Sequence, residues 1–595
     1  MMLPTAGAAG PTANYDLTRV LTERIEVGIR AAYPDSPMAA AAQVRSSAQP
    51  KFGDFQANFA MALGKALGKP PREVAESVVA AADLSGLAER VEIAGPGFLN
   101  IHLRTEAIAA ALVAMEGAEL GVPQPGTGQH PVAIDLCGVN VAKQMHVGHL
   151  RATIIGDTLA RIHERLGWRA TRQNHLGDWG LPIAMTIAAL RRIGADLSKV
   201  TLDDLNIAYR GAQEDASEAA QAEAKRTLLA LQAGSAAEVA DWNQLIAVTM
   251  KEVFEAAAIL GVHLTPEHSR GESFFRDQLA GVVDEFLSRG IARVDDGAVV
   301  VPFADRERPL LIRKSDGGFM YSTTDLAAIR YRVQTLGAGK VVYVVDARQR
   351  DHFRDVFDAV RLIGWDKLPD GTQAELIHLP FGAVLGDDRK PLKTRSGRNV
   401  TLMSLLSEAI ERGRAQVRTR AAQPESPTGG LCAAELDGIG LAVGIAAVKY
   451  ADLSNDVTSD YTFDIDRMVS FEGDTGPYIQ YAHARIASIV GKAGDSAADI
   501  TTPIDPAEPN ERALALRLLR YGAALRSAAN DLQPARLCAY LFDLANAYNG
   551  FYQSCPVLKC PDPKVAGSRL HLCELTRRTL ADGLSLLGIT APPKM

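Results

Sequence analysis

Cysteine is scarce in this sequence: there are 6 among 595 residues, and they form no paired framework. Such usage is typical of proteins in a reducing compartment. Uncharged apolar runs of about 18 residues are also absent, which excludes a membrane-spanning helix. Residues 1–14 lack the basic and apolar segments of a secretory signal, so we expect a cytoplasmic protein.

Positive charge is not in excess either. The 63 Lys and Arg residues are outnumbered by 70 Asp and Glu, which gives a formal net charge of −7. This balance excludes a wholly basic, histone-like binder of nucleic acid, but it permits local basic patches. The segment from Arg389 to Arg420 is one, since its acidic residues are only Glu408 and Glu411. Composition alone leaves open whether this segment is a solvated helix face or a contact for a polyanion.

The length predicts about four domains, at about 150 residues each. Residues 1–122 are expected to form a small mixed α/β domain. Its segments 54–67 and 71–81 have helical spacing, and 91–103 reads as two strands around a Gly-Pro-Gly turn. The Gly- and Pro-rich residues 121–131 are a plausible linker.

A second pattern begins near residue 131. An apolar strand at 132–136 precedes a loop and a long amphipathic helix, and further strands are expected at 299–302 and 341–345. Strands that alternate with helices predict a Rossmann-type parallel sheet covered on both faces, here over 123–400. Helical residues at about 190–285 read as an insertion. We expect connecting helices over 401–450 and an all-α bundle over 451–595, with breaks near 423–430 and 493–509.

The most informative segment is VNVAKQMHVGHLR at 139–151. His146 and His149 are three residues apart at the expected start of the helix, so both rings project from its first turn. Free backbone N–H groups there favour phosphate, and imidazoles can stabilise charge as pyrophosphate leaves. Gly148 leaves room for a nucleotide to approach, and Lys143 and Arg151 add positive charge nearby. A chance grouping on a surface helix is the alternative.

The segment resembles the first signature of class I aminoacyl-tRNA synthetases, and its surroundings resemble the arginyl-tRNA synthetases. The matching motifs run in order along nearly the whole chain: NVAK at 140–143, HLRATIIGD at 149–157, NHLGDWG at 174–180, YSTTDLA at 321–327 and GDTGPYIQYAH at 473–483. The resemblance implies a Rossmann-type catalytic domain, an N-terminal domain for the tRNA elbow and a C-terminal bundle for the anticodon. It also implies ATP and L-arginine as substrates, with Mg²⁺ accompanying ATP. We expect a monomer.

Class I synthetases carry a second loop that closes over the triphosphate. The corresponding stretch here, 386–397, offers Lys390, Lys393 and Arg395 in a Gly- and Pro-containing loop. Its usual lysine-serine-lysine core is degenerate. In the family that it resembles, the lysine ahead of the first histidine compensates, and the matching residue is Lys143. On its own, the loop could also be a solvated hairpin.

A guanidinium substrate needs rigid carboxylates that can accept two hydrogen bonds. The resemblance assigns the arginine side chain to four residues and the arginine α-amino group to a fifth. Those for the side chain are Asp135, Tyr321, Asp325 and Gln349, and that for the α-amino group is Asn140. Each has an alternative role: Asp135 could cap a loop, and Tyr321 could pack in a core.

Aromatic and basic residues in the bundle are candidates for RNA contact. Tyr478, Tyr481 and Arg485 lie on one helix face, and such groups stack on unpaired bases. The spacing alone favours a packed core, whereas the resemblance implies the anticodon loop. Cys555, Cys560, His571 and Cys573 do not have the spacing of a zinc site, so we expect no zinc.

The chain also departs from the family pattern. It has Cys137-Gly138-Val139 ahead of Asn140, and Gln144 where proline is common; an accessible Cys137 beside the pocket could react with thiol reagents. Two other functions remain as alternatives. One is a nucleotidyltransferase with the same histidine motif, which would not need the final helices. The other is a non-catalytic RNA-binding paralogue, against which the intact motif counts.

Overall fold

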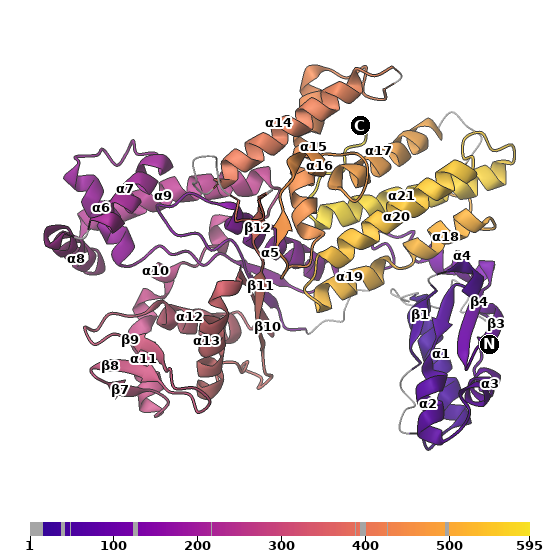
Figure 1. Ribbon diagram of the computed structural model, residues 1–595, viewed down its shortest axis with the longest axis horizontal. Helices are drawn as coiled ribbons and strands as arrows, with labels where there is room; N and C mark the ends of the chain where they lie inside the picture. Colours follow the sequence, from indigo (N-terminus) through magenta and orange to yellow (C-terminus); the bar gives the residue numbers. More distant parts are fainter. Residues whose placement is uncertain are drawn as a thin grey trace.

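The computed structural model describes residues 16–36, 42–47, 49–122, 129–215, 217–386, 388–392, 400–424, 426–493 and 499–595. Figure 1 shows a parallel sheet at the centre, with two groups of added elements on one side. On the other side lie the C-terminal helices and, beside them, the N-terminal domain. Within these described residues, none of the helices is long and apolar enough to cross a membrane.

The N-terminal domain is an antiparallel four-stranded sheet with helices. Its sheet order is β1-β2-β4-β3. The elements are β1 (Val44–Ser46), β2 (Phe55–Ala57), β3 (Ala88–Ala94), β4 (Phe98–Leu103), α1 (Leu17–Ala32), α2 (Phe59–Leu67), α3 (Pro71–Ala81) and α4 (Thr105–Val113). The predicted helix at 71–81 and the two strands within 91–103 are confirmed. The prediction at 54–67 is wrong for its first residues, because Phe55–Ala57 pairs with β4 as a strand before the helix begins.

The central sheet is parallel, as predicted, and has the order β11-β10-β5-β6. Its strands are β5 (Val132–Asp135), β6 (Ala170–Gln173), β10 (Lys340–Asp346) and β11 (Glu375–Phe381). The long helix α5 (Val147–Arg165) follows β5. Because all four strands run the same way, their carboxyl ends meet at one edge, where ligands of such sheets bind.

The strand predicted at 299–302 exists as β8 (Ala298–Val301), but it does not join the parallel sheet. It lies in a separate antiparallel sheet between β7 (Arg293–Asp295) and β9 (Leu310–Arg313). The cause is the turn at Asp296 and Gly297, where both residues have positive φ, 45° and 80°. An Asp-Gly pair in this conformation makes a tight hairpin, so β7 and β8 must be antiparallel.

Helices fill the segment predicted as an insertion. They are α6 (Leu181–Arg192), α7 (Leu202–Glu214), α8 (Glu218–Gln232), α9 (Ala236–Ile259), α10 (Glu272–Phe275) and α11 (Leu279–Ser288). Two more helices frame the carboxyl edge of the sheet: α12 (Tyr321–Arg330) and α13 (Arg350–Ile363). A five-residue π-helix (Tyr331–Thr335) continues α12.

The C-terminal part is helical, as predicted, except for the two-residue strand β13 (Tyr461–Thr462), which pairs with β12 (Val384–Leu385). Its helices are α14 (Leu402–Ala421), α15 (Ala433–Leu453), α16 (Ile465–Met468), α17 (Gly476–Lys492), α18 (Pro509–Leu518), α19 (Tyr521–Asn530), α20 (Ala535–Ser554) and α21 (Pro563–Leu586). The N-terminal domain packs against this bundle. Arg512 of α18 binds Asp54 at 2.6 Å, and Arg526 of α19 binds Asp16 at 2.5 Å.

A buried ion pair joins the sheet domain to the C-terminal helices. Arg151 of α5 lies 3.0 Å from Asp452 of α15, and both side chains are at most 1% exposed. The Arg151 guanidinium also donates to the backbone oxygens of Gly382 (2.8 Å) and Ser459 (3.0 Å). Arg151 thus lies beside the histidine motif, as expected, and lines a cavity there, but its guanidinium is paired within the protein. Its charge holds two domains together.

This pair predicts a large stability loss when one partner is removed. We expect Asp452→Ala to lower the free energy of unfolding by about 3–5 kcal/mol, because it leaves a buried guanidinium without its counter-charge. The matched control is Asp466→Ala, which breaks the exposed pair with Arg412 and should cost about 1 kcal/mol or less. Chemical denaturation of both variants checks this, and equal losses would contradict the assignment.

Candidate active site

A cavity of about 490 Å³ opens at the carboxyl edge of the parallel sheet, beside the start of α5. Residues from β10, from the segment after β11 and from the second loop line it together with the first turn of α5. Among them are His146, Gly148, Asp346, Arg348, Phe381, Val384, Pro391 and Leu392. Two of the three residues predicted for ATP in the histidine motif, His146 and Gly148, therefore face one cavity, and His149 adjoins them.

The two imidazoles are fixed by backbone hydrogen bonds. The Nδ1 atom of His146 accepts from the Gly148 N–H at 3.1 Å, and the Nδ1 of His149 accepts from the His146 N–H at 3.0 Å. The ring centroids are 4.0 Å apart. Since each Nδ1 is an acceptor, each neutral ring carries its proton on Nε2. The start of α5 therefore offers ring N–H donors to an anion, whereas the sequence predicted free backbone N–H groups.

Both imidazoles stay neutral around pH 7. Burial and the neighbouring His146 and Lys143 lower the pKa of His149 to about 3. Burial also lowers the pKa of His146, with smaller effects from Lys143 and Arg348. Neutral Nε2–H groups can donate to phosphoryl oxygens without carrying a charge of their own.

Gly148 has a steric role that the sequence did not reveal. A Cβ atom there would lie 2.9 Å from Cε1 of His146 and 3.1 Å from its Nδ1. The absence of a side chain lets the His146 ring fold back over the first turn. This requirement accounts for glycine between the histidines without any nucleotide contact.

The second loop is described only in part. Lys390 is exposed, and Pro391 and Leu392 line the cavity. Lys393 and Arg395 lie outside the described residues. The Nζ of Lys143 sits over the ring of Tyr209 at 4.5 Å, a cation–π contact with the helical insertion.

Three of the predicted arginine-binding residues lie on or beside α12 and α13, namely Tyr321, Asp325 and Gln349. The Asp325 carboxylate is 2.6 Å from Nε2 of His352 and 3.8 Å from Nε2 of His175. The ring of Tyr321, 56% exposed, packs on His352 with centroids 4.7 Å apart. Tyr321 and Asp325 thus share the first turns of α12, as their spacing predicted, and His352 connects them.

The segment between β10 and α13 brings the two halves of the site together. Arg348 lines the cavity and acts on the His146 ring electrostatically, while His352, four residues later, binds Asp325. Gln349 lies between them, exposed at the start of α13. The groups predicted to face phosphate and those predicted to face arginine therefore border one short stretch of chain.

Asp135 differs from the expectation. Its carboxylate is bonded to the guanidinium of Arg332, and both residues are buried at 3% and 0% exposure. Arg332 belongs to the π-helix after α12, and its guanidinium also lies 4.7 Å from the ring of Tyr343. The structure thus gives Asp135 an internal partner instead of a free acceptor. Nothing in the local sequence pointed to Arg332.

The loop that carries Asn140 is held by the motif at 174–180. The Gly138 N–H donates to Oδ1 of Asn174 at 3.2 Å, and the Val141 N–H donates to the Gly177 carbonyl at 3.0 Å. A Cβ at Gly177 would come 2.0 Å from Oδ1 of Asn140, so only glycine fits there. The segment 174–180 therefore holds the backbone of this loop, and Gly177 leaves room for the Asn140 side chain.

Cys137 does not behave as a reactive thiol. It is 4% exposed, and burial raises its pKa to about 12. The expected reaction with thiol reagents is therefore disfavoured, because the thiolate is scarce at neutral pH.

Glu272, at the start of α10, was missed by sequence reasoning. Burial, with Asp178 and Asp325 close by, raises its pKa to about 8. A cation bound here would offset the negative charge that these three carboxylates bring together. No local motif marks this residue, because it comes to the site only through the fold.

The residues predicted for the anticodon form an aromatic and basic cluster on α17. Tyr481 accepts from Arg485 at 2.9 Å, and the hydroxyl of Tyr478 accepts from Asn549 at 2.6 Å. The sequence missed Arg420 of α14, whose guanidinium lies 4.2 Å from the Tyr481 ring centroid. The cluster is partly exposed and so is neither pure core nor a free surface.

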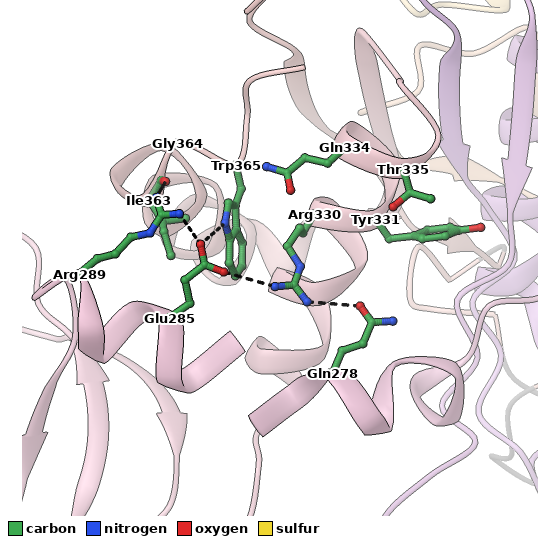
Figure 2. Close-up of a pocket in the computed structure, with 10 residues that line it drawn as sticks. All are labelled: Gln278, Glu285, Arg289, Arg330, Tyr331, Gln334, Thr335, Ile363, Gly364 and Trp365. Carbon is green, nitrogen blue, oxygen red and sulfur yellow. Dashed lines mark hydrogen bonds and ion pairs between the residues drawn. The ribbon is translucent and has the colours of Figure 1, made fainter. Parts of the chain in front are cut away.

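A second cavity, of about 370 Å³, lies at the other end of α12 (Figure 2). Glu285 stands at its centre, 2.5 Å from Arg289 and 3.5 Å from Arg330. Arg330 in turn lies over Trp365 at 4.8 Å. None of the predicted site residues lines this cavity, and its charged groups pair with one another.

Family models match three consecutive parts of the chain. They are "Arginyl tRNA synthetase N terminal domain" at residues 19–103, "tRNA synthetases class I (R), catalytic domain" at 114–465 and "DALR anticodon binding domain" at 479–595. The catalytic model alone spans more than half of the chain. The chain belongs to the arginyl-tRNA synthetases. It is therefore a ligase of class I, and the parallel sheet with its histidine motif is the catalytic domain of that class.

Individual relatives agree with this membership. An arginine–tRNA ligase of Thermobifida fusca is 44% identical over 98% of this chain and 100% of its own length, and one of Marinomonas is 42% identical with the same coverage. Arginyl-tRNA synthetase structures from Plasmodium falciparum and Thermus thermophilus superpose with TM-scores of 0.82 and 0.80 at 26% and 28% identity. The superposition on the Plasmodium falciparum structure covers 98% of this chain and 99% of that structure's chain. For the Thermus thermophilus structure the two shares are 97% and 100%.

The orientation of the His146 ring predicts separable effects of two substitutions. Asparagine is a favoured N-cap and can accept from the Gly148 N–H, but it lacks the Nε2–H donor. We expect His146→Asn to keep wild-type stability and to lower the rate of amino-acid activation about 10²–10³-fold. His146→Ala should show the same rate loss and also lose about 1 kcal/mol of stability. A loss below about tenfold for His146→Asn would contradict donation to the reacting phosphate.

Proposed function

We propose that this synthetase joins L-arginine to tRNA(Arg) in two steps. The arginine carboxylate attacks the α-phosphate of ATP, which releases pyrophosphate and forms arginyl-adenylate. The ribose of the terminal adenosine of tRNA then attacks the arginyl carbonyl, which releases AMP. The observation that carries this proposal is the segment 346–352, which borders both the neutral imidazole pair and the Asp325 carboxylate.

The activation step needs positioning and charge stabilisation but no protein nucleophile. The Nε2–H groups of His146 and His149 would donate to phosphoryl oxygens as negative charge develops on the leaving pyrophosphate. Lys143 and the loop residues Lys390, Lys393 and Arg395 would supply mobile positive charge. Mg²⁺ enters this scheme with ATP, as part of the substrate. Among the described residues, no group of three or more His, Cys, Asp or Glu side chains could hold a metal ion.

Specificity for arginine would come from carboxylate and aromatic groups. Asp325, held by His352, would accept from the guanidinium, with the Tyr321 ring and Gln349 as neighbours and Asn140 on the α-amino group. Asp135 would either bind the substrate guanidinium in place of the Arg332 guanidinium or keep Arg332 in position. Glu272 is an additional carboxylate in this region.

RNA contacts are assigned to the bundle and the N-terminal domain. The cluster of Tyr478, Tyr481 and Arg485 would stack on unpaired anticodon bases, and residues 1–122 would meet the tRNA elbow. The catalytic domain would span 123–400, with connecting helices over 401–450 and the anticodon domain over 451–595. We place the protein in the cytoplasm as a monomer.

A charging assay with total tRNA and each amino acid tests the proposed function. We expect only arginine to be esterified. We also expect pyrophosphate exchange with arginine only when tRNA is present, as the family resemblance implies. Charging with another amino acid, or none at all, would overturn the assignment. Exchange at an equal rate without RNA would overturn its tRNA dependence.

Asp325 separates arginine recognition from ATP binding. Asp325→Ala removes the carboxylate bonded to His352, so we expect arginine charging to fall by about 10²-fold or more, as when a buried charged hydrogen bond is lost. ATP binding, measured by equilibrium titration, should stay within about twofold. Asp325→Asn, which keeps the shape of the side chain but removes its negative charge, serves as the isosteric control. An equal loss of arginine and ATP binding would make Asp325 a structural residue.

A further inference from the structure

A fully buried lysine connects the catalytic domain to the end of the anticodon bundle. Lys449 of α15 is 0% exposed, and its Nζ donates to the backbone oxygens of Leu260 (2.7 Å) and Gly588 (3.0 Å). Leu260 ends α9, in the helical insertion, and Gly588 follows α21, the last helix of the bundle. Carbonyls at helix ends lack partners within the helix, and this one amino group binds both ends.

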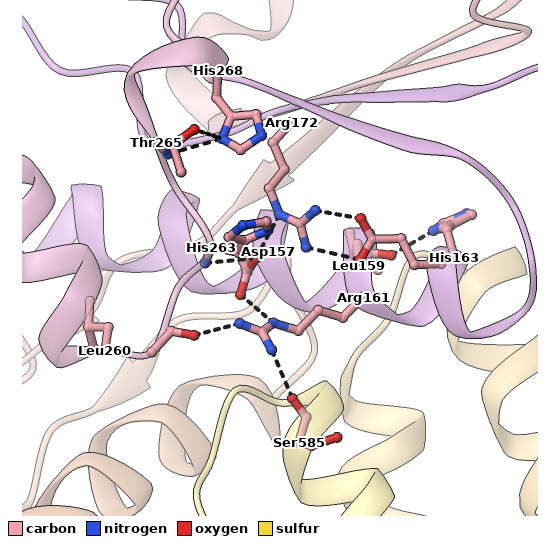
Figure 3. A network of polar contacts seen from close by, with 12 residues as sticks. Asp157, Leu159, Arg161, His163, Arg172, Leu260, His263, Thr265, His268 and Ser585 are labelled. Atoms are coloured by element: carbon pink, nitrogen blue, oxygen red, sulfur yellow. Dashed lines mark hydrogen bonds and ion pairs between the residues drawn. The ribbon is translucent and has the colours of Figure 1, made fainter. Parts of the chain in front are cut away.

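Arg161 of α5 makes the same kind of connection from the sheet domain (Figure 3). It donates to the Gly261 oxygen at 2.6 Å and to the Ser585 oxygen at 3.3 Å, and it binds Asp157 at 2.7 Å. The ends of α9 and α21 are thus each held twice, once from α5 and once from α15. We call Lys449, Arg161, Asp157, Gly261 and Gly588 together the helix-end junction, because they join the sheet domain, the helical insertion and the bundle.

The geometry of the junction requires glycine at 588. Gly588 has a φ of +63°, and a Cβ there would lie 2.2 Å from the Nζ of Lys449. Left-handed glycine is a common way to end a helix, but here the missing side chain also makes room for the amino group. The close approach of Lys449 to the chain after α21 is therefore a built feature.

A series of hydrogen bonds connects the junction to the loop that carries Asn140. Oδ1 of Asp157 accepts from Nε of Arg172 at 2.8 Å, and Arg172 lies on β6 of the parallel sheet. Two residues on, Oδ1 of Asn174 accepts from the Gly138 N–H at 3.2 Å, in the loop that carries Asn140. The bundle end and the arginine-binding loop are thus the two ends of one continuous set of contacts.

The amino group is costly where it lies. Burial lowers the pKa of Lys449 to about 7, with Asp157 opposing this and Arg161 adding to it. An apolar side chain would avoid desolvating an amine, but it would leave the Leu260 and Gly588 oxygens without this donor. The charge is therefore tied to holding both helix ends at once.

We propose that Lys449 and Arg161 are positioning residues that transmit the docking of tRNA on the bundle to the arginine site. The proposal rests on the proposed function, because it concerns tRNA-dependent activation. A shift of α21 on RNA binding moves the carbonyls that Lys449 and Arg161 hold. Asp157 and Arg172 then bias the position of β6 and of the loop beside Asn140.

The test compares Lys449→Met with wild type in the full chain. We expect the turnover of tRNA-dependent exchange to fall, or the KM for arginine to rise, by at least about fivefold, a typical size of coupling between sites. The Kd for tRNA should stay within about twofold. The matched control is Lys564→Met, at the exposed start of α21, which should change neither quantity.

A double-mutant cycle distinguishes coupling from loss of packing. Gly588→Ala should impair turnover in wild type, because its Cβ displaces Nζ. In the Lys449→Met background the nearest atoms are the Gly261 oxygen at 3.3 Å and Cε of residue 449 at 3.5 Å. The part of the effect that comes from the Nζ contact should therefore disappear, while the cost of the positive φ stays the same in both backgrounds. If Lys449→Met fails to fold, Arg161→Lys, which keeps the charge and removes carbonyl contacts, takes its place.

Two outcomes overturn the proposal. In one, tRNA affinity falls in proportion to turnover, so that the junction only holds the bundle in place. In the other, neither variant changes the arginine kinetics. Failure of the wild-type protein to charge arginine would instead refute the proposed function, so the two failures are distinguishable.

Discussion

The hydrogen bonds from the backbone at the start of α5 to two imidazole Nδ1 atoms determine the chemistry of this site. They pair the N–H groups of His146 and Gly148, which a helix end would otherwise present to an anion, and they leave Nε2 of each ring as the protonated nitrogen. In the mechanism that we propose, side chains therefore take over charge stabilisation from these backbone groups. The glycine between the histidines, the strand before them and the lowered pKa values all serve this arrangement.

Buried charges recur wherever parts of the chain meet. Arg151 and Asp452 join α5 to α15, Arg332 and Asp135 join the π-helix to β5, and the Asp157 group joins α5 to β6. The first two pairs join elements far apart in sequence, whereas α5 and β6 follow one another along the chain. An uncompensated buried charge is costly, so such pairs favour one relative placement of the elements over its alternatives. These contacts therefore specify geometry more than they add stability.

Local patterns in the sequence predicted much of this structure. The apolar strand, the histidine turn and the helix after it were predictable because they depend on residues close in sequence, and so was the pairing of Tyr321 with Asp325 along α12. Pairings over long distances were not. Arg332 beside Asp135, and Glu272 beside Asp325, are determined by how the helices pack on the sheet. The sheet to which β8 belongs depends on the Asp296-Gly297 turn, a local signal for a hairpin that competes with the alternation of strands and helices around it.

The N-terminal domain is fastened to the bundle by side chains. Arg512 and Arg526 bind it from α18 and α19, and Arg578 of α21 donates to the backbone oxygens of Glu116 and Gly117 at 2.8 and 2.5 Å. These contacts set the separation between the N-terminal domain and the bundle. An RNA that touched both parts, as we propose for tRNA, would have to match that separation, and its arm length would then matter independently of its base sequence.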